Sequence, residues 1–433
     1  MVNPILIQVG KTISQISKKL NRGNGSTWPG HIALKGNKNF IKEFLKDSKM
    51  KVIIVAGTNG KTTTSSLIAT ALTKNGYKVL QNDSGANLLN GVASTLILNT
   101  NHSGKLTQEF AIFEVDENAL PQVLKQVTPD YLILLNLFRD QLDRYGEINT
   151  IVKKWKEALS LLPSSTTLIL NADDPQIAYL GLGEGRDAGD AVQNNLYFGL
   201  DNKHSNIVQQ AADATSCPNC GTQLVFDTIF FSHLGKWECT SCGLKRPKID
   251  QDSFFEYPLS GMYNKYNTHA AILVLREIGM KEKAIAGAFK GFTPVFGRQE
   301  VIRYRNKNVQ LFLSKNPTSF NQSFATIKEL HASTLLIVLN DRIPDGKDVS
   351  WIWDTDLSGI EKFKHILVAG DRVYDMALRI KYENYKNIKT FENLDEAINT
   401  GITLTEKDAT FFILPTYSAM LDARKILTGK KIL

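Results

Sequence analysis

The stretch at residues 51–72, KVIIVAGTNGKTTTSSLIATAL, constrains the fold of this chain more than any other. Residues 52–56 form a short apolar run rich in β-branched side chains, which is typical of a buried strand. Residues 62–72 carry Leu67, Ile68 and Leu72 at helical spacing. Glycines between a strand and a helix let backbone amides turn toward an anion at the positive end of the helix. The stretch therefore predicts a phosphate-binding loop inside an α/β domain.

The loop is shorter than the usual phosphate-binding pattern, which has its first glycine five positions before Gly60, where this chain has Val55. Here the loop reads G-x-x-G-K-T. Lys61 supplies positive charge for the outer phosphates of a nucleotide, and the hydroxyl of Thr62 is placed to bind Mg²⁺. An ordinary glycine turn is the alternative, but it does not account for this order of residues. We therefore expect a nucleoside triphosphate site made by Gly57, Thr58, Asn59, Gly60, Lys61, Thr62 and Thr63.

Apolar strands and helical stretches alternate along most of the chain, which predicts largely parallel sheets of the α/β class. A length of 433 residues favours two or three domains. We expect a lead-in segment at 1–48, a central ATP-binding domain at 49–296, and a smaller Rossmann-like α/β domain at 297–433. The turn-rich sequence GFTPVFGRQEV marks the joint between the two domains. A polar stretch at about 203–252 interrupts the central domain.

All four cysteines of the chain lie in that polar stretch, as the pairs CPNC and CTSC with eighteen residues between them. Each C-x₂-C pair presents two thiolates to one tetrahedral ion, which predicts a structural zinc ribbon. Free thiols or two disulfides are the alternative, and they are disfavoured in a cytoplasmic protein. The expected zinc ligands are Cys217, Cys220, Cys239 and Cys242. Such a site has no open position for substrate, and it leaves the chain without a cysteine for catalysis.

The N-terminal stretch has the pattern of an amphipathic helix, because Leu6, Val9, Ile13, Ile16 and Leu20 follow a 3-4-3-4 spacing. Docking of this stripe on the protein's own domain is the preferred interpretation, and a helix lying on a membrane surface is the alternative. The sequence has no run of eighteen apolar residues and no signal-peptide pattern, so we expect a cytoplasmic protein. A formal net charge of +8 favours anionic partners, whether nucleotide, lipid headgroup or nucleic acid.

Acidic and amide side chains follow several predicted strands, at the edge where α/β sheets bind ligands. Glu114 comes directly after FAIF and is the preferred second ligand of Mg²⁺, with Asp116 and Glu117 as competitors. Similar groups follow two more strands, namely Asp140, Asp143 and Arg144 in one case and Asn171, Asp173 and Asp174 in the other. Each signal is weak alone, because Asn and Asp also form turns. Together they predict a polar sheet edge beside the phosphate loop.

Six motifs together resemble the Mur ligases and folylpolyglutamate synthetases: GTNGKT at 57, EVDE at 114, NLFRDQLDRYG at 136, NADDP at 171, LSGMYNKYNTHAA at 259 and FGRQE at 296. The motifs are spread over most of the chain, and the short loop is that superfamily's own form. The resemblance implies an ATP-dependent ligase in which Lys61 and Glu114 act in catalysis with Mg²⁺. It also implies that Asn264 and Asn267 line the adenine side and that Arg298 reaches the nucleotide from the interdomain joint.

Two departures within that superfamily resemble the MurT ligase subunits. Only about 48 residues precede the ATP-binding domain, so a separate UDP-binding domain is not expected, and a zinc ribbon is inserted. The sequence NDRIPDGKDVSWIWD adds to this resemblance. It implies amidation of the D-glutamate α-carboxylate in the lipid II stem peptide to D-isoglutamine, through an acyl phosphate and with ammonia from a GatD-type glutaminase in a heterodimer. A lipid-linked substrate implies a peripheral position at the inner face of the plasma membrane.

The same resemblance implies that the C-terminal domain lends the glutaminase an aspartate, which completes a Cys-His-Asp triad across the interface. Asp354 is the preferred candidate, because Trp351 and Trp353 beside it are typical interface anchors. Asp348 and Asp356 are the other candidates, and a purely loop-forming role for all three is the alternative.

Two other functions stay open at this point. A ligase that adds an amino acid, as Mur or folylpolyglutamate ligases do, shares the ATP site but needs neither partner nor ribbon. A nucleic-acid-binding ATPase with a zinc ribbon needs basic residues on the ribbon. The sequence between the cysteine pairs, GTQLVFDTIFFSHLGKWE, carries few of them, so no nucleic-acid partner is expected.

Overall fold

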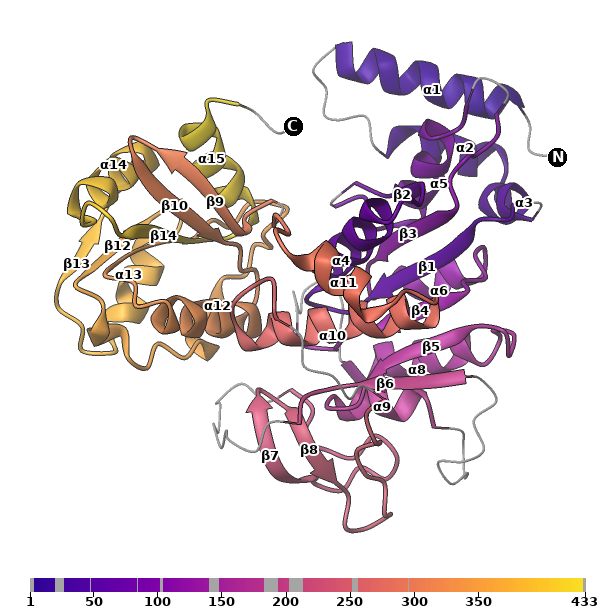
Figure 1. Cartoon of the computed structure of the whole chain (residues 1–433). Coiled ribbons are helices and arrows are strands. Elements are labelled where there is room, and N and C mark those ends of the chain that lie inside the picture. The colour runs from indigo at the N-terminus through magenta and orange to yellow at the C-terminus, as the bar shows by residue number, and fades with distance from the viewer. Residues whose placement is uncertain are drawn as a thin grey trace.

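The computed structural model describes residues 4–19, 27–46, 48–83, 85–101, 104–139, 148–182, 194–201, 213–250, 256–294 and 296–430. These residues form two six-stranded sheets, each with helices around it, and a two-stranded hairpin that extends from the N-terminal body (Figure 1). Asp140, Asp143 and Arg144 of the predicted sheet edge lie outside the described residues.

The helices alternate with the strands along the chain. They are α1 (Pro4–Lys19), α2 (Trp28–Gly36), α3 (Phe40–Leu45), α4 (Lys61–Lys74), α5 (Leu89–Leu98), α6 (Leu120–Leu124), α8 (Ile148–Leu159), α9 (Pro175–Leu180), α10 (Met262–Glu277), α11 (Glu282–Phe289), α12 (Pro317–Glu329), α13 (Val373–Lys381), α14 (Leu394–Leu404), α15 (Tyr417–Thr428) and the short 3₁₀ helices η1 (Ser350–Asp354) and η2 (Ile360–Lys362). Among these described helices, none combines the length and hydrophobicity needed to cross a bilayer.

The first sheet has the strand order β2-β3-β1-β4-β5-β6, and every neighbouring pair is parallel. Its strands are β1 (Lys51–Ala56), β2 (Val79–Gln81), β3 (Phe110–Val115), β4 (Tyr131–Leu134), β5 (Thr167–Asn171) and β6 (Asn194–Phe198). The chain passes from β1 to one edge, returns through β3 beside β1, and continues with β4 on the other side. Ligands of such sheets bind beyond the carboxyl ends of the strands where the order reverses. The loop after β1 lies at that point.

Both faces of this sheet are buried, which explains the continuous apolar run in β1. Val52 and Ile54 face a core that includes residues of α5 and α8. Ile53 and Val55 face a second core, built with α4, α10 and α11. Successive strand residues point to opposite faces, so helices on both sides hold β1 in place. The direction in which the chain leaves the sheet after Ala56 is thereby fixed.

The N-terminal helix α1 contacts α2 and α5, as docking on the protein's own domain predicts. The predicted stripe is wrong in detail, because Val9 is 39% exposed whereas Ile7 and Gly10 are buried. A β-carbon at Gly10 would lie 3.0 Å from Ile97 Cγ2, so the missing side chain allows a close approach to α5. A face centred on glycine therefore packs inward in place of the apolar stripe. The side chains of Ile16 and Leu20 lie outside the described residues.

The second sheet has the order β13-β12-β11-β14-β10-β9. Its strands are β9 (Arg298–Tyr304), β10 (Lys307–Phe312), β11 (Thr334–Val338), β12 (His365–Ala369), β13 (Ile388–Thr390) and β14 (Thr410–Pro415). All neighbouring pairs are parallel except β9 and β10, which form an antiparallel hairpin. Arg305 and Asn306 form its two-residue turn with φ of 46° and 65°. The sequence analysis predicted an interdomain joint where β9 begins, and it did not predict the strand.

The N-terminal body is built on the sheet of β1–β6, and the C-terminal body is built on the sheet of β9–β14. The C-terminal body contacts the phosphate loop and the start of α10. Gly261, just before α10, has φ of 91°, and a β-carbon there would lie 2.3 Å from Thr326 Oγ1 of α12. Asn316 caps α12 and donates its Nδ2 to Asn59 Oδ1 at 3.3 Å. The two bodies therefore meet beside the loop. The domain limits 1–48, 49–296 and 297–433 stay predictions.

Candidate nucleotide-binding and metal sites

The loop between β1 and α4 depends on its two glycines. Gly57 has φ of 140° and Gly60 has φ of 92°, conformations that favour glycine. A β-carbon at Gly57 would lie 3.0 Å from the backbone N and O of Asn136, and one at Gly60 would lie 2.1 Å from Asn267 Oδ1. The loop is therefore pressed between the segment after β4 and helix α10, and α4 begins directly after it at Lys61.

The segment after β4 holds the loop by hydrogen bonds. Asn136 accepts the amide of Asn59 through Oδ1 at 2.9 Å and donates its Nδ2 to Asn59 O at 3.1 Å. Thr58 Oγ1 accepts the amide of Phe138 at 3.1 Å. Sequence reasoning missed Asn136 and Phe138, although both stand in the NLFRDQLDRYG motif. The motif alone gives no sign that these two residues contact the loop.

Lys61 is buried, and its ammonium group is held by the loop itself. Nζ donates to the carbonyl of Gly57 and, at 3.2 Å, to that of Thr58. It also lies 3.3 Å from Glu117 Oε2, and the two side chains are only 10% and 2% exposed. Glu117 was a competitor for Mg²⁺, and the structure pairs it with Lys61. The other competitor, Asp116, accepts the amide of Asn118 at 3.0 Å and shapes a turn.

Thr62 and Glu114 meet at the sheet edge. Thr62 Oγ1 donates to Glu114 Oε2 at 2.6 Å, and both residues are buried. Asn82 fixes the backbone of Glu114, because its Oδ1 accepts the Glu114 amide at 2.8 Å and its Nδ2 donates to the Glu114 carbonyl at 3.0 Å. A hydroxyl and a carboxylate are the hard oxygen ligands that Mg²⁺ prefers. The pair therefore fits a magnesium site next to the phosphate loop.

Burial raises the pKa of Glu114, because the surrounding protein disfavours the charged carboxylate. The Arg298 guanidinium, the Thr62 hydroxyl and the Lys61 ammonium act in the opposite direction without cancelling the effect. Arg298 is the first residue of β9, and burial lowers its own pKa while Glu114 opposes that shift. The two bodies thus contribute opposite charges to one site.

These groups line a cavity of about 210 Å³ between the two bodies. From α10, Asn267 Nδ2 donates to Asn264 Oδ1 at 3.1 Å, and both side chains are buried in the wall. The cavity brings together the predicted residues Thr58, Asn59, Gly60, Lys61, Thr62, Thr63, Glu114, Asn264, Asn267 and Arg298. Lining residues that the sequence did not predict include Phe138, Phe231, Leu234, Tyr266, Lys315 and Tyr417.

The other strand-end groups have structural partners. Asp174 caps α9 and accepts the amide of Leu137 at 2.9 Å. Asp173 accepts the Tyr266 hydroxyl at 2.7 Å and pairs with Arg246 at 2.5 Å. The predicted polar edge is therefore present, and these two aspartates hold neighbouring segments around the cavity.

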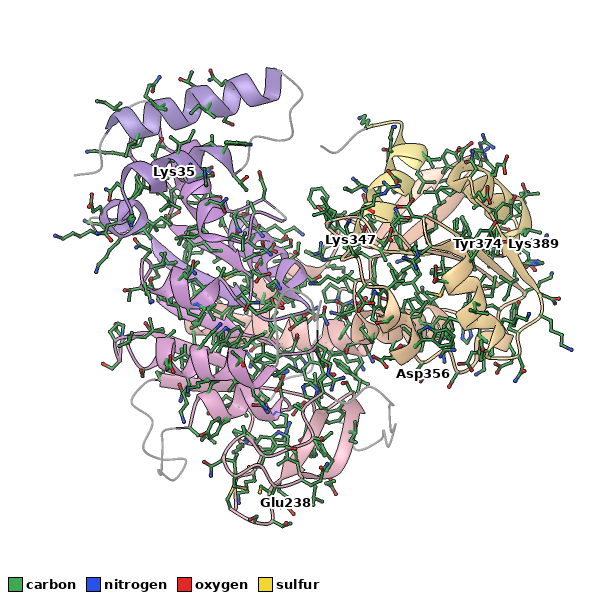
Figure 2. The ribbon with its side chains drawn as sticks, turned by 180° about the vertical axis from the view of Figure 1, so that it is seen from behind. Lys35, Glu238, Lys347, Asp356, Tyr374 and Lys389 are labelled. Carbon is green, nitrogen blue, oxygen red and sulfur yellow. The ribbon has the colours of Figure 1, made fainter. Side chains whose placement is uncertain are left out.

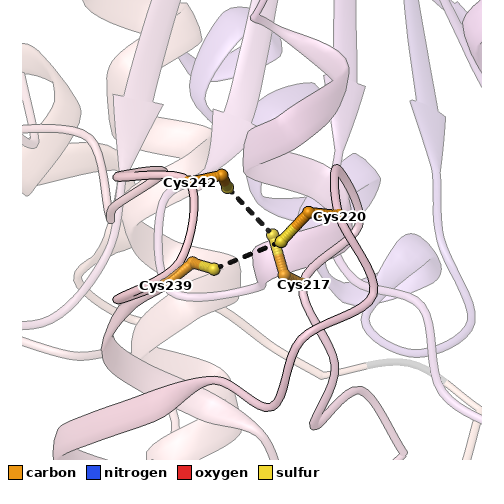
Figure 3. A group of neighbouring side chains, drawn as sticks. All are labelled: Cys217, Cys220, Cys239 and Cys242. Atoms are coloured by element: carbon orange, nitrogen blue, oxygen red, sulfur yellow. Dashed lines mark hydrogen bonds between the residues drawn. The ribbon is translucent and has the colours of Figure 1, made fainter.

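The four cysteines lie together, as Figure 3 shows. Their two pairs stand before and after the hairpin formed by β7 (Val225–Phe231) and β8 (Leu234–Glu238). All four sulfur atoms lie within 4.8 Å of one another, and the pairs Cys217–Cys242 and Cys220–Cys239 are 3.6 Å and 3.5 Å apart. A tetrahedral zinc ion with Zn–S bonds of about 2.3 Å separates its sulfurs by about 3.8 Å. The cluster therefore fits one ion with little rearrangement.

The two knuckles turn in the same way. Gly221 and Gly243 have φ of 77° and 75°, and their amides donate to Cys217 O and Cys239 O at 2.9 Å and 3.0 Å. The Thr222 hydroxyl, 3.4 Å from the Cys220 sulfur, is the main cause that lowers the pKa of Cys220 to about 6. Burial raises the pKa of Cys217 to about 12, and a bound dication opposes that effect by stabilising the thiolate.

If the four cysteines bind zinc, as the sequence predicts, replacing Cys217 with serine is expected to release the ion and unfold the ribbon, because ion binding supplies most of the folding free energy of so small a unit. Cys217 also packs against Trp237 in the ribbon's small core. Zinc content by plasma mass spectrometry and tryptophan fluorescence measure the two effects. Ser241→Ala, an exposed change in the second knuckle, is the control and should leave both unchanged. Full zinc content in the Cys217 variant contradicts the four-sulfur site.

The three candidate triad aspartates lie on the C-terminal body around η1. Asp348 Oδ1 accepts the amide of Ser350 at 2.8 Å, and this bond lowers the pKa of Asp348. Asp356, labelled in Figure 2, accepts the amide of Ser358 at 2.9 Å. Asp354 is exposed, and no hydrogen bond or ion pair joins its side chain to another described residue. Its carboxylate is the freest of the three.

Comparisons with known proteins agree with this organisation. The chain matches the family "Mur ligase middle domain" over residues 55–275 and "MurT ligase C-terminal" over residues 313–420. The curated MurT subunit of lipid II isoglutaminyl synthase (glutamine-hydrolyzing) from Streptococcus pneumoniae is 32% identical, over 95% of this chain and 94% of that protein. The chain belongs to the MurT family of Mur ligases. The MurT subunit from Staphylococcus aureus is 33% identical, over 85% of this MurT chain and 86% of its relative.

Solved structures share the fold of this MurT chain. The pseudomurein peptide ligase type C from Methanothermus fervidus has a TM-score of 0.67 at 22% identity and covers 90% of this chain and 81% of its own. MurF ligase from Thermotoga maritima, solved in complex with ADP, has a TM-score of 0.60 at 16% identity, with coverages of 90% and 82%. As a MurT-family protein the chain is a ligase, of a fold that uses ATP and Mg²⁺, and its four cysteines form a possible metal site. Its MurT relatives are named as subunits, which implies a complex.

Proposed function

We propose that this MurT-family chain amidates the α-carboxylate of D-glutamate in the lipid II stem peptide, with ATP and ammonia, to give D-isoglutamine. One observation carries the proposal: Thr62 and Glu114 pair beside Lys61, in a cavity that a MurT-type C-terminal body closes. The named activity of relatives that match nearly the whole chain supports the same reaction. The division into segments 1–48, 49–296 and 297–433 is part of this proposal.

Lys61, Glu114 and Arg298 each have a role toward ATP. Lys61 leaves its contacts with the loop carbonyls and neutralises charge on the transferred phosphoryl group. Thr62 and Glu114 would hold Mg²⁺, and the bound ion would further neutralise that charge. Arg298 adds a positive group from the second body, so the phosphates draw the two bodies together. Asn264 and Asn267 lie in the cavity wall, and we assign them to the adenine side of the nucleotide.

The reaction has two steps. A carboxylate oxygen of the substrate attacks the γ-phosphorus, the bond to the bridging oxygen breaks, and ADP leaves with the electron pair. Ammonia then attacks the acyl carbon of the resulting acyl phosphate. The bond from that carbon to the phosphate oxygen breaks, phosphate leaves, and a proton passes from nitrogen to solvent. The chain positions the two reactants and stabilises the charge that moves to phosphate.

We assign the release of ammonia from glutamine to a second protein. Hydrolysis of a carboxamide by covalent catalysis needs an activated nucleophile, and all four cysteines of this chain sit in the ribbon. A glutaminase of the GatD type supplies that cysteine in the proposed complex. The relatives are named glutamine-hydrolyzing and are called subunits, which supports a heterodimer.

Asp354 is the residue that we assign to the partner's triad. Asp348 and Asp356 each accept a backbone amide two residues further on, which is a turn-forming contact. Asp354 instead follows Trp353, a residue that is 48% exposed and whose ring meets the Tyr382 ring edge-on at 5.3 Å. A fixed, exposed aromatic ring is typical of an interface anchor. Docking of a glutaminase on this surface brings the free carboxylate to its histidine.

Replacing Asp354 with asparagine is expected to lower glutamine-dependent amidation by at least about a hundredfold, because the partner's histidine loses its orienting charge. Ammonium-dependent amidation by the same variant should not change, since the ATP site is untouched. Both rates are measured with lipid II, ATP and the glutaminase partner, with Asp348→Asn as the matched control. Loss of the ammonium-dependent rate, or an unaffected glutamine-dependent rate, contradicts the assignment.

Nucleic acid is not a partner in this proposal. Between the cysteine pairs, Lys236 is paired with Asp201 at 2.7 Å and His233 is buried, so the ribbon offers little positive charge to phosphates. The net charge of +8 instead suits an anionic lipid-linked substrate at the inner face of the plasma membrane.

A further inference from the structure

The hairpin of the zinc ribbon reaches the nucleotide cavity with its tip. Strands β7 and β8 are joined at Ser232 and His233, and the cysteine pairs stand at the opposite end of the hairpin. Phe231 and Leu234, on either side of the tip, line the cavity and are 3% and 0% exposed. Two ribbon residues therefore belong to the wall of the nucleotide site.

Phe231 is the centre of a cluster of rings in that wall. Its ring stacks on Phe138, with centroids 6.0 Å apart and planes at 27°, and meets Tyr266 edge-on at 5.6 Å. Phe138 is tied to the phosphate loop through Thr58, and Tyr266 precedes Asn267 on α10. The cavity thus has an aromatic part beside the loop, in addition to the charged part at Glu114 and Arg298.

Buried polar contacts fix the hairpin to this aromatic part. The amide of Gly235, two residues past the tip, donates to Asp173 O at 3.0 Å. Asp173 pairs with Arg246 of the ribbon through Oδ1 at 2.5 Å, and its Oδ2 accepts the Tyr266 hydroxyl at 2.7 Å. One carboxylate therefore joins the ribbon to a ring of the cavity by charge-assisted hydrogen bonds, which are stronger than neutral ones.

The cysteine end is connected to the same hairpin. Trp237 of β8 packs with Cys217 and Cys239 in the ribbon's small core, and its Nε1 donates to Ala172 O at 3.0 Å. Cys239 follows β8 directly. A small ribbon has too little apolar core to hold its strands without its ion. Loss of the ion is therefore expected to loosen the cysteine end of the hairpin, whose other end carries Phe231.

We propose that the ribbon hairpin forms the wall against which the nucleotide base packs, so that zinc in the ribbon and ATP in the cavity favour each other's binding. The inference rests on the proposed nucleotide site. Phe231 offers an aromatic ring to a flat base, and the buried Leu234 pairs with Phe231 across the hairpin. Because binding free energies are linked, the factor by which zinc raises the affinity for ATP equals the factor by which ATP raises the affinity for zinc.

The test uses the full chain and the change Phe231→Leu, which keeps an apolar side chain but removes the ring. Titration calorimetry gives the Kd of the Mg²⁺ complexes of a non-hydrolysable ATP analogue and of tripolyphosphate, which has no base. The variant is expected to bind the ATP analogue about tenfold more weakly, because a stacking contact is lost. Its affinity for tripolyphosphate should equal that of the wild type.

Val225→Ala is the control, because Val225 stands on the same strand near the cysteines and is 49% exposed. It should leave both affinities unchanged, and the melting temperature of each variant reports its folding. An unchanged affinity of the Phe231 variant for the ATP analogue overturns the base wall. An equal loss for tripolyphosphate also overturns it. If the wild type binds neither ligand, the proposed nucleotide site itself fails.

Zinc affinity gives a second, independent readout. Competition with a chromogenic chelator in excess Mg²⁺ measures the apparent zinc affinity with and without the ATP analogue. The analogue is expected to raise the zinc affinity of the wild type several-fold and to have a smaller effect on Phe231→Leu. Equal zinc affinities with and without nucleotide in the wild type overturn the linkage.

Discussion

Replacing Lys61 with methionine is expected to lower the rate of ATP-dependent amidation by at least about a hundredfold, because the charge that neutralises the transferred phosphoryl group is lost. The substitution also breaks the buried pair with Glu117, whose side chain is 2% exposed. A carboxylate left charged and unpaired in such a place costs about 3–5 kcal/mol of folding free energy. The single variant is therefore expected to be both inactive and less stable.

The double variant Lys61→Met/Glu117→Gln separates these two effects, because it leaves no unpaired charge. Calorimetry should show that the melting temperature of the double variant returns most of the way to that of the wild type. Its amidation rate should stay as low as that of the single variant. An active double variant contradicts the role of Lys61 toward phosphate. A single variant as stable as the wild type contradicts the buried pair.

Replacing Glu114 with glutamine is expected to weaken binding of the magnesium–ATP complex by at least about a hundredfold and to raise the stability of the nucleotide-free protein. The carboxylate is a ligand of Mg²⁺ in the proposed site, and an amide oxygen carries no charge for that purpose. Without nucleotide, burial raises the pKa of Glu114, so ionisation of this carboxyl group costs folding free energy. Glutamine keeps an acceptor for the Thr62 hydroxyl without that cost.

The direction of the pKa shift fixes the pH dependence. A carboxyl group with a raised pKa in the folded state binds its proton more readily when folded, so its contribution to stability is greatest at low pH and falls as pH rises. The advantage of Glu114→Gln over the wild type should therefore widen from about pH 4.5, the ordinary value, through the raised pKa. Thermal unfolding across this range measures it, with the exposed Glu157→Gln as control. Parallel profiles of the wild type and Glu114→Gln contradict the shift.

Features that depend on residues close together in the sequence were predictable. The loop from Gly57 to Thr63 follows from one strand, two glycines and one helix, and the ribbon follows from two cysteine pairs. Glu114 was found because a strand end fixes its position relative to the loop. The roles of these residues toward ATP stay predictions, but the fold brings them together around one cavity.

Features that depend on packing between distant segments were not predictable. Phe138, Phe231 and Tyr266 come from three separate segments and meet only in the folded protein. In the sequence, Phe231 is one more apolar residue of a ribbon strand. Glu114 and Glu117 are three residues apart, and only the placement of α4 against β3 decides which meets Thr62 and which meets Lys61.

Two errors of the sequence analysis have local physical causes. The strand β9 begins directly after the turn at Gly297, and its residues alternate between half-buried and exposed, so the apolar pattern of a buried strand is weak there. In α1, the small Gly10 lets the helix approach α5 closely, and this contact outweighs the burial of Val9. A pattern of apolar residues does not reveal a helix face that packs closely because a glycine on it has no side chain.

The most direct test of the proposed function incubates the purified chain with lipid II, ATP and Mg²⁺, and supplies either ammonium or free amino acids as the nitrogen source. Mass spectrometry of the stem peptide distinguishes the products. Amidation is expected with ammonium alone, with ADP formed in equal amount and no amino-acid adduct. An amino-acid adduct without any amide from ammonium contradicts the proposal and assigns the chain to the amino-acid-adding ligases.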